Sequence, residues 1–181
     1  MKSALDVHQE LLAHDVPHEV VRLGQRVLTA DDLPRALGIE PGRCVALRCY
    51  VVQGGRRAFA AVMVGAGSTP DPAALLDVLG ATSVRPATAD QVNVATDYTA
   101  GLVSPVCLPD SVTLLADGAL LAVDVLYTAL GEGGVALGIR SQDLLAATGA
   151  EVAPLTQAPA RTAQVIDLDA HALRPTRRSA G

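Results

Sequence analysis

The chain has 181 residues, of which half are apolar, and a net charge of −5. This length suits one domain with short appendages, and the acidic balance argues against non-specific nucleic-acid binding through bulk charge. With one Phe, three Tyr and no Trp, the core has to be built from Leu, Val, Ala and Ile.

The three cysteines, Cys44, Cys49 and Cys107, have no metal-ligand spacing. We expect them to be small core residues in a reducing, cytoplasmic compartment, with a catalytic cysteine as the alternative. We expect no secretory signal, because the first residues lead into an amphipathic stretch, and charges interrupt the apolar segment 112–130. That segment is therefore expected to form core strand and helix and not a membrane span.

Apolar periodicity, capping residues and turn residues predict a mixed α/β domain. The elements expected in the first half are a helix over 3–14, a strand over 18–23, a helix over 29–37, a hairpin of strands 43–52 and 57–64, and a helix over 72–79 ended by Gly80. Those expected later are a strand over 83–85, a short helix capped by Thr88, a loop over 101–105, a strand over 112–117, a segment 119–126 that fits helix or strand, a turn over 131–134, a strand over 135–139 and a helix from Ser141 to Gly149.

The composition shifts to Ala, Pro, Thr and Arg near residue 154, and no periodic apolar pattern continues beyond it. We therefore expect residues 1–154 to form the folded domain and residues 155–181 to form a mobile tail.

Gly101 and Pro105 bracket three residues that can run extended. Glycine permits a left-handed or close backbone approach, and proline removes an amide donor and fixes φ. Such a loop can present backbone N–H groups to an oxygen-rich ligand without a charged side chain. The alternative is that both residues only shape a connection.

Arg48 is the most unusual charge in the chain because it lies inside the apolar strand pattern 43–52. A buried-strand arginine can bind a phosphate or a carboxylate, or it can extend from an edge so that only its head is solvated. The sequence leaves these two interpretations open.

The order of these elements and four short stretches resemble the YbaK/ProX family of aminoacyl-tRNA editing domains over about residues 3–153. The stretches are the hairpin 45–64, the helix 72–79 with Gly80-Ala81 after it, the loop Gly101-Leu102-Val103-Ser104-Pro105, which matches the family's G-x-x-x-P, and Gly134 with Asp143-Leu144-Leu145 and Gly149-Ala150. The resemblance implies a mixed, mainly antiparallel sheet with flanking helices.

The resemblance also implies an activity, which is hydrolysis in trans of the ester of a mischarged tRNA, classically a proline tRNA. The implied partners are aminoacyl-tRNA and prolyl-tRNA synthetase. Neither a membrane nor a metal nor a cofactor is implied. The implied catalytic residues are Gly101, Ser104, Pro105 and Arg48, and the implied substrate-binding residues are Tyr98, Leu102, Val103, Thr128 and Asp117.

Three departures from the family pattern leave a second function open. The family's lysine on the first hairpin strand falls on Ala46, its serine in the second hairpin on Ala129, and its aspartate in the following strand on Ala136. Arg48, two residues after Ala46 on the same strand face, could supply the missing positive charge. The alternative function is a non-catalytic protein on the same fold that binds tRNA or another ligand.

Overall fold

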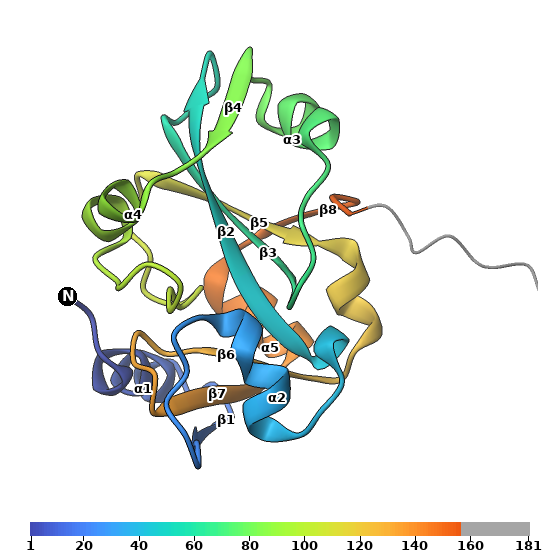
Figure 1. The fold of residues 1–181 in the computed structure, drawn as a ribbon. Coiled ribbons are helices and arrows are strands. Elements are labelled where there is room, and N and C mark those ends of the chain that lie inside the picture. The colour runs from blue at the N-terminus through green and yellow to red at the C-terminus, as the bar shows by residue number, and fades with distance from the viewer. Residues whose placement is uncertain (157–181) are drawn as a thin grey trace, which may run out of the picture.

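A computed structural model describes residues 1–156 and shows one eight-stranded mixed sheet with helices on both faces (Figure 1). The strands are β1 (His18–Arg22), β2 (Cys44–Gln53), β3 (Phe59–Gly65), β4 (Ser83–Pro86), β5 (Val112–Asp117), β6 (Val125–Ala129), β7 (Val135–Arg140) and β8 (Glu151–Ala153). The helices are α1 (Ala4–Ala13), α2 (Leu33–Leu37), α3 (Pro72–Leu79), α4 (Ala89–Thr96) and α5 (Ser141–Thr148). Three 3₁₀ turns are η1 (Ala30–Asp32), η2 (Pro41–Arg43) and η3 (Gly118–Ala122).

The long strand β2 joins the two halves of the sheet, whose strand order is β1-β7-β6-β2-β3-β5-β8. It pairs antiparallel with β3 along most of its length, and parallel with β6 at Cys44 and Val45. Its last residues, from Tyr50 to Gln53, also pair with β4. Four of the seven strand pairings are antiparallel, which confirms the predicted mixed, mainly antiparallel sheet.

Successive residues of β2 point to opposite faces of the sheet, so each face has its own core. Val45 on one face belongs to the largest apolar cluster, which also contains Leu11 of α1 and Leu144 of α5. Ala46 on the other face packs in a cluster with Leu33 of α2. The side chains of Cys44 and Cys49 lie on opposite faces, as their spacing predicts.

Local capping explains where several helices begin and end. Ser3 and Thr88 accept hydrogen bonds from the amides three residues later, and each forms a capping box. Gly38, Gly80 and Gly149 end α2, α3 and α5 in the left-handed conformation. The predicted ends of α1, α3 and α5 are therefore confirmed to within about two residues. The helix predicted over 29–37 is an α-helix only from Leu33, because Ala30–Asp32 form the 3₁₀ turn η1.

Two further regions differ from the sequence expectation. Residues 119–126, which fitted helix or strand, divide into η3 and the first residues of β6, because Asp124 interrupts the apolar run between them. The short strand β8 was not predicted, since three residues leave no periodic signal, and it pairs parallel with β5.

The end of the described chain packs against the domain. Leu155 is fully buried, and its amide donates a hydrogen bond to Asp117. The predicted tail, apart from residues 155 and 156, lies outside the described residues. The longest helix in residues 1–156 has ten residues, and none there is long and apolar enough to cross a membrane.

Candidate functional site

Gly101 is exposed and adopts a left-handed backbone conformation, with φ of +86°. A Cβ at this position would lie 2.9 Å from the carbonyl oxygen of Leu28 and 3.2 Å from Cγ2 of Thr29. The Gly101 carbonyl accepts a hydrogen bond from the Ala30 amide, with an N–O distance of 2.8 Å. The neighbouring segment therefore approaches Gly101 so closely that only glycine fits without a shift.

The loop continues from Gly101 into the protein interior. Leu102 joins the apolar cluster on the α2 side of the sheet, whereas Val103 joins the larger core on the other side. The Leu102 carbonyl accepts a hydrogen bond from the amide of Gly131, at 2.9 Å. Within residues 1–156, the amides of Gly101, Val103 and Ser104 donate no hydrogen bond. The loop thus has a fixed shape, and of the residues with unpaired amides only Gly101 is exposed.

Ala46, Ala129 and Ala136 lie side by side across β2, β6 and β7, and we call these three residues the alanine row. Ala129 and Ala136 are direct partners, and the parallel pairing of β2 with β6 places Ala46 level with Ala129. All three side chains are at most 2% exposed, and they pack in one cluster with Leu33 and Leu102.

The alanine row joins three positions that are far apart in the sequence. The family resemblance places a lysine, a serine and an aspartate there, which would meet at one point of the sheet. In this chain the same point is apolar and buried, next to the loop residue Leu102. It therefore offers contact with methyl and methylene groups but no acid, base or nucleophile.

Arg48 is held by two neighbouring segments. Its Nη1 and Nη2 donate to the two carboxylate oxygens of Asp31, at 2.7 and 2.8 Å, and its Nε donates to the Ser68 carbonyl at 3.0 Å. Asp31 also accepts a hydrogen bond from the Gly67 amide, at 2.8 Å. The hydrogen bond from Arg48 is the main reason why the pKa of Asp31 lies below its ordinary value.

The ion pair between Arg48 and Asp31 is connected to the loop through one residue. Asp31 follows Ala30, whose amide holds the Gly101 carbonyl. The structure therefore places Arg48 where it can fix the turn that supports Gly101, while both edges of its guanidinium are already occupied.

Tyr98 and Ser104 make their hydrogen bonds within the loop itself. The hydroxyl of Tyr98, which is fully buried, donates to the Val106 carbonyl at 2.7 Å, and burial raises the pKa of Tyr98. The Val106 amide donates to Oγ of the buried Ser104 at 3.3 Å. These two predicted site residues therefore stabilise the shape of the loop.

Thr128 and Asp117 lie apart from the alanine row. Thr128 is fully buried and points to the other face of the sheet from Ala129, where its Oγ1 donates to the Val45 carbonyl at 3.2 Å. Asp117 accepts hydrogen bonds from the amides of Leu155 and Thr156 and from the Thr156 hydroxyl. The structure therefore does not bring these two predicted residues together with the loop.

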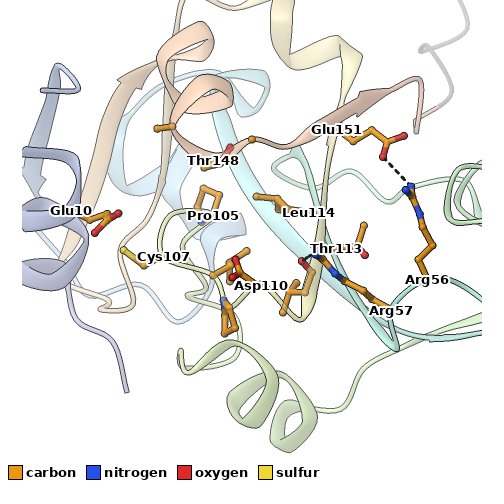
Figure 2. Close-up of a pocket in the computed structure, with 15 residues that line it drawn as sticks. Glu10, Arg56, Arg57, Pro105, Cys107, Asp110, Thr113, Leu114, Thr148 and Glu151 are labelled. Carbon is orange, nitrogen blue, oxygen red and sulfur yellow. Dashed lines mark hydrogen bonds and ion pairs between the residues drawn. The ribbon is translucent and has the colours of Figure 1, made fainter. Parts of the chain in front are cut away.

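A cavity of about 500 Å³ borders the far end of the loop at Pro105 (Figure 2). Figure 2 shows Arg56 and Arg57 on one side of this cavity, and both are already engaged. Arg57 donates to the Val112 carbonyl at 3.0 Å, and Arg56 lies 3.7 Å from the Glu151 carboxylate. The cavity is thus bordered by partnered cations and lies on the opposite side of the sheet from the alanine row.

The three cysteines do not provide an activated nucleophile. Burial raises the pKa of Cys49 to about 12 and that of Cys44 to about 11, and it also raises the pKa of Cys107. A nucleophilic cysteine needs the opposite shift. Within residues 1–156, no group of three or more His, Cys, Asp or Glu side chains could hold a metal ion.

Sequence reasoning missed Asp31 and Tyr127. Asp31 was visible only as part of a helix-capping segment, and nothing in its neighbourhood along the chain indicates the pairing with Arg48 seventeen residues later. Tyr127 lies in an apolar run and gives no polar pattern of its own. Strand pairing alone reveals its position beside Arg43 and Glu19.

The mixed sheet, the left-handed Gly101 and the buried loop up to Pro105 agree with the fold that the resemblance implies. A family model described as "Aminoacyl-tRNA editing domain" matches residues 25–147, which is more than half of the chain. The chain therefore belongs to the aminoacyl-tRNA editing domain family. A search of curated proteins finds no match.

Solved structures share the fold over nearly their whole length. The chain is similar to the hypothetical protein APE2540, with 25% identity, a TM-score of 0.76, and coverage of 83% of this chain and 99% of that one. It is also similar to a candidate trans-editing enzyme for prolyl-tRNA synthetase, with 26% identity, a TM-score of 0.73, and coverage of 86% and 97%.

Proposed function

We propose that this protein is a trans-acting deacylase that hydrolyses the ester of a mischarged tRNA, with proline tRNA as its substrate. The observation that carries the proposal is the loop at Gly101, which is rigidly held, has unpaired backbone amides and opens to solvent at one end. Family membership and the trans-editing neighbour support the reaction class and the tRNA.

The proposed chemistry needs a polarised carbonyl and a positioned water more than a strong nucleophile. Backbone N–H groups of the loop would donate to the ester carbonyl oxygen and stabilise the negative charge that develops there. A water oxygen bonds to the carbonyl carbon, the bond from that carbon to the ribose oxygen breaks, and the ribose oxygen takes the proton. The products are the free amino acid and the uncharged tRNA.

The surroundings of Gly101 favour a small acyl group. The neighbouring alanine row and Leu102 present only apolar atoms, and none of them is more than 7% exposed. A large or charged side chain would have to displace this packing. We therefore expect alanyl and cysteinyl esters to be better substrates than longer or charged ones.

The test is deacylation of a panel of mischarged proline tRNAs by the wild-type protein, beginning with the alanyl and cysteinyl forms. Gly101→Ala and Arg48→Ala are compared with it at a temperature at which all three proteins are folded. We expect turnover to fall in both variants, because the first distorts the loop and the second releases its support. Turnover that is the same in all three proteins would contradict the role of the loop.

The alanine row favours a second candidate function, which is aminoacyl-tRNA binding without hydrolysis. The point at which three polar family positions meet holds only methyl groups, so no side chain there could orient a water. This candidate predicts binding of charged tRNA with no release of amino acid above the spontaneous rate. Release that is lost in Gly101→Ala would exclude it.

A further inference from the structure

Tyr127, Arg43 and Glu19 form a cluster on the same sheet face as the alanine row, and we call these three residues the Tyr127 cluster. The guanidinium carbon of Arg43 lies 5.7 Å from the centre of the Tyr127 ring. The Tyr127 hydroxyl donates to Oε1 of Glu19 at 3.2 Å. The ring is thus held at its edge by a carboxylate and faced by a cation.

Strand register explains how these side chains meet. Glu19 pairs with Gly138, and Gly138 pairs with Tyr127, so the three residues form a row across β1, β7 and β6. A Cβ on Gly138 would lie only 2.5 Å from Oε1 of Glu19. Because glycine leaves this space open, the Glu19 carboxylate can lie across β7 and reach the tyrosine hydroxyl.

The Tyr127 cluster is accessible, and the Arg43 guanidinium lies on its exposed side. Arg43 is exposed and Tyr127 is half-buried. Within residues 1–156, no carboxylate forms an ion pair with Arg43, whereas Arg48, Arg56 and Arg140 each have one. An aromatic ring beside an uncompensated arginine is a combination that binds unpaired nucleotides, because the ring stacks on the base and the cation meets the phosphate.

The position of the cluster relative to the loop fits one end of a nucleic acid. Tyr127 lies two residues before Ala129, about 7 Å along the strand. Ala129 in turn shares a cluster with the loop residue Leu102. The loop residue Leu102 and Tyr127 therefore pack against one apolar cluster, so the loop and the Tyr127 cluster belong to the same region of the domain.

We propose that Tyr127 and Arg43 dock the unpaired terminal nucleotide at the 3′ end of aminoacyl-tRNA. The base stacks on the outer face of the ring, and the exposed Arg43 guanidinium moves off that face to meet the phosphate. This inference rests on the proposed function, because the acyl ester joins that nucleotide to the loop. The Glu19 carboxylate accepts a hydrogen bond from the tyrosine hydroxyl, whereas the stacking itself needs only the aromatic ring.

The experiment compares two uncharged RNA hairpins, one ending in an unpaired CCA strand and one lacking the terminal adenosine. Binding to the full chain is measured by fluorescence anisotropy of the labelled RNA at two salt concentrations. The variants are Tyr127→Leu, which keeps apolar bulk, Tyr127→Phe, which keeps the ring, and Arg43→Gln. Arg56→Gln is the control, since it also removes an exposed positive charge, here from the β2–β3 turn.

We expect the wild type to bind the complete hairpin about tenfold more tightly than the shortened one, as for one stacked base. Tyr127→Leu should abolish this preference, and Tyr127→Phe should keep it. Arg43→Gln should weaken binding of both hairpins and reduce the salt dependence of binding. Arg56→Gln should change neither the affinity nor its salt dependence. If Tyr127 had only a structural role, Tyr127→Leu would weaken binding of both hairpins equally.

Several results would overturn the proposal. These are no binding of either hairpin, equal binding of both by the wild type, an unchanged preference in Tyr127→Leu, or equal losses in Arg43→Gln and Arg56→Gln. A failure of the proposed deacylase function gives a different result. A protein that shows the terminal-nucleotide preference but releases no amino acid from charged tRNA docks the nucleotide and is not a deacylase.

Discussion

Replacing Gly101 with alanine tests the loop most directly, because the strain has two parts that can be worked out from the structure. A non-glycine residue at a φ of +86° costs about 1–2 kcal/mol. The new methyl group would also lie 2.9 Å from the Leu28 carbonyl oxygen, and overpacking against backbone typically adds about 1–2 kcal/mol. We therefore expect Gly101→Ala to lower the free energy of unfolding by about 2–4 kcal/mol.

Gly67→Ala separates the two parts of this strain. Gly67 has a similar φ of +79°, but nothing lies within 4 Å of a Cβ built on it. It should therefore lose only the conformational part, about 1–2 kcal/mol. Urea unfolding of the wild type and both variants gives the two differences. If Gly101→Ala is no less stable than Gly67→Ala, the close approach of Leu28 does not constrain the loop and this reasoning is wrong.

Three further predictions follow from buried or paired groups. The pKa of Asp31 is lowered in the folded state, so its pairing with Arg48 stabilises the protein fully above the ordinary value of 3.8 and is lost as the pH falls through the lower folded value. Asp31→Asn should therefore lower the Tm by about 3 °C at pH 7 and by progressively less on acidification. A difference in Tm that does not change with pH would contradict this. Asp117→Ala should lower the free energy of unfolding by about 2 kcal/mol, since it leaves the Leu155 amide unpaired; a loss below about 0.5 kcal/mol would refute that role. Burial raises the pKa of Cys49 from 9.0 to about 12, so its thiol should react with iodoacetamide roughly a thousandfold more slowly in the folded than in the unfolded protein at pH 8. Comparable rates in the two states would show that the thiol is not buried.

The sequence predicted the elements well where a local signal marks their ends. The caps at Ser3 and Thr88 and the left-handed glycines at Gly80 and Gly149 depend only on neighbouring residues, so short patterns identify them. Strand β8 has no such signal, because three residues become a strand only through pairing with β5.

The candidate site was predicted less completely, because its parts meet only through long-range pairing. The loop was visible from Gly101 and Pro105 alone. The link from Arg48 through Asp31 to the loop joins three separate segments, and no spacing in the chain indicates it. The same is true of Tyr127 and Glu19, which are 108 residues apart in sequence.

The alanine row makes single charged substitutions costly. Ala46→Lys alone would bury an ammonium group in an apolar cluster, and Ala136→Asp alone would bury the opposite charge there. Either change costs several kcal/mol, much of the stability of a typical domain. The two charges could offset each other only if both substitutions were present together. Each alanine therefore raises the cost of a charge at the other two positions, and a polar site at this point of the sheet needs at least two substitutions together.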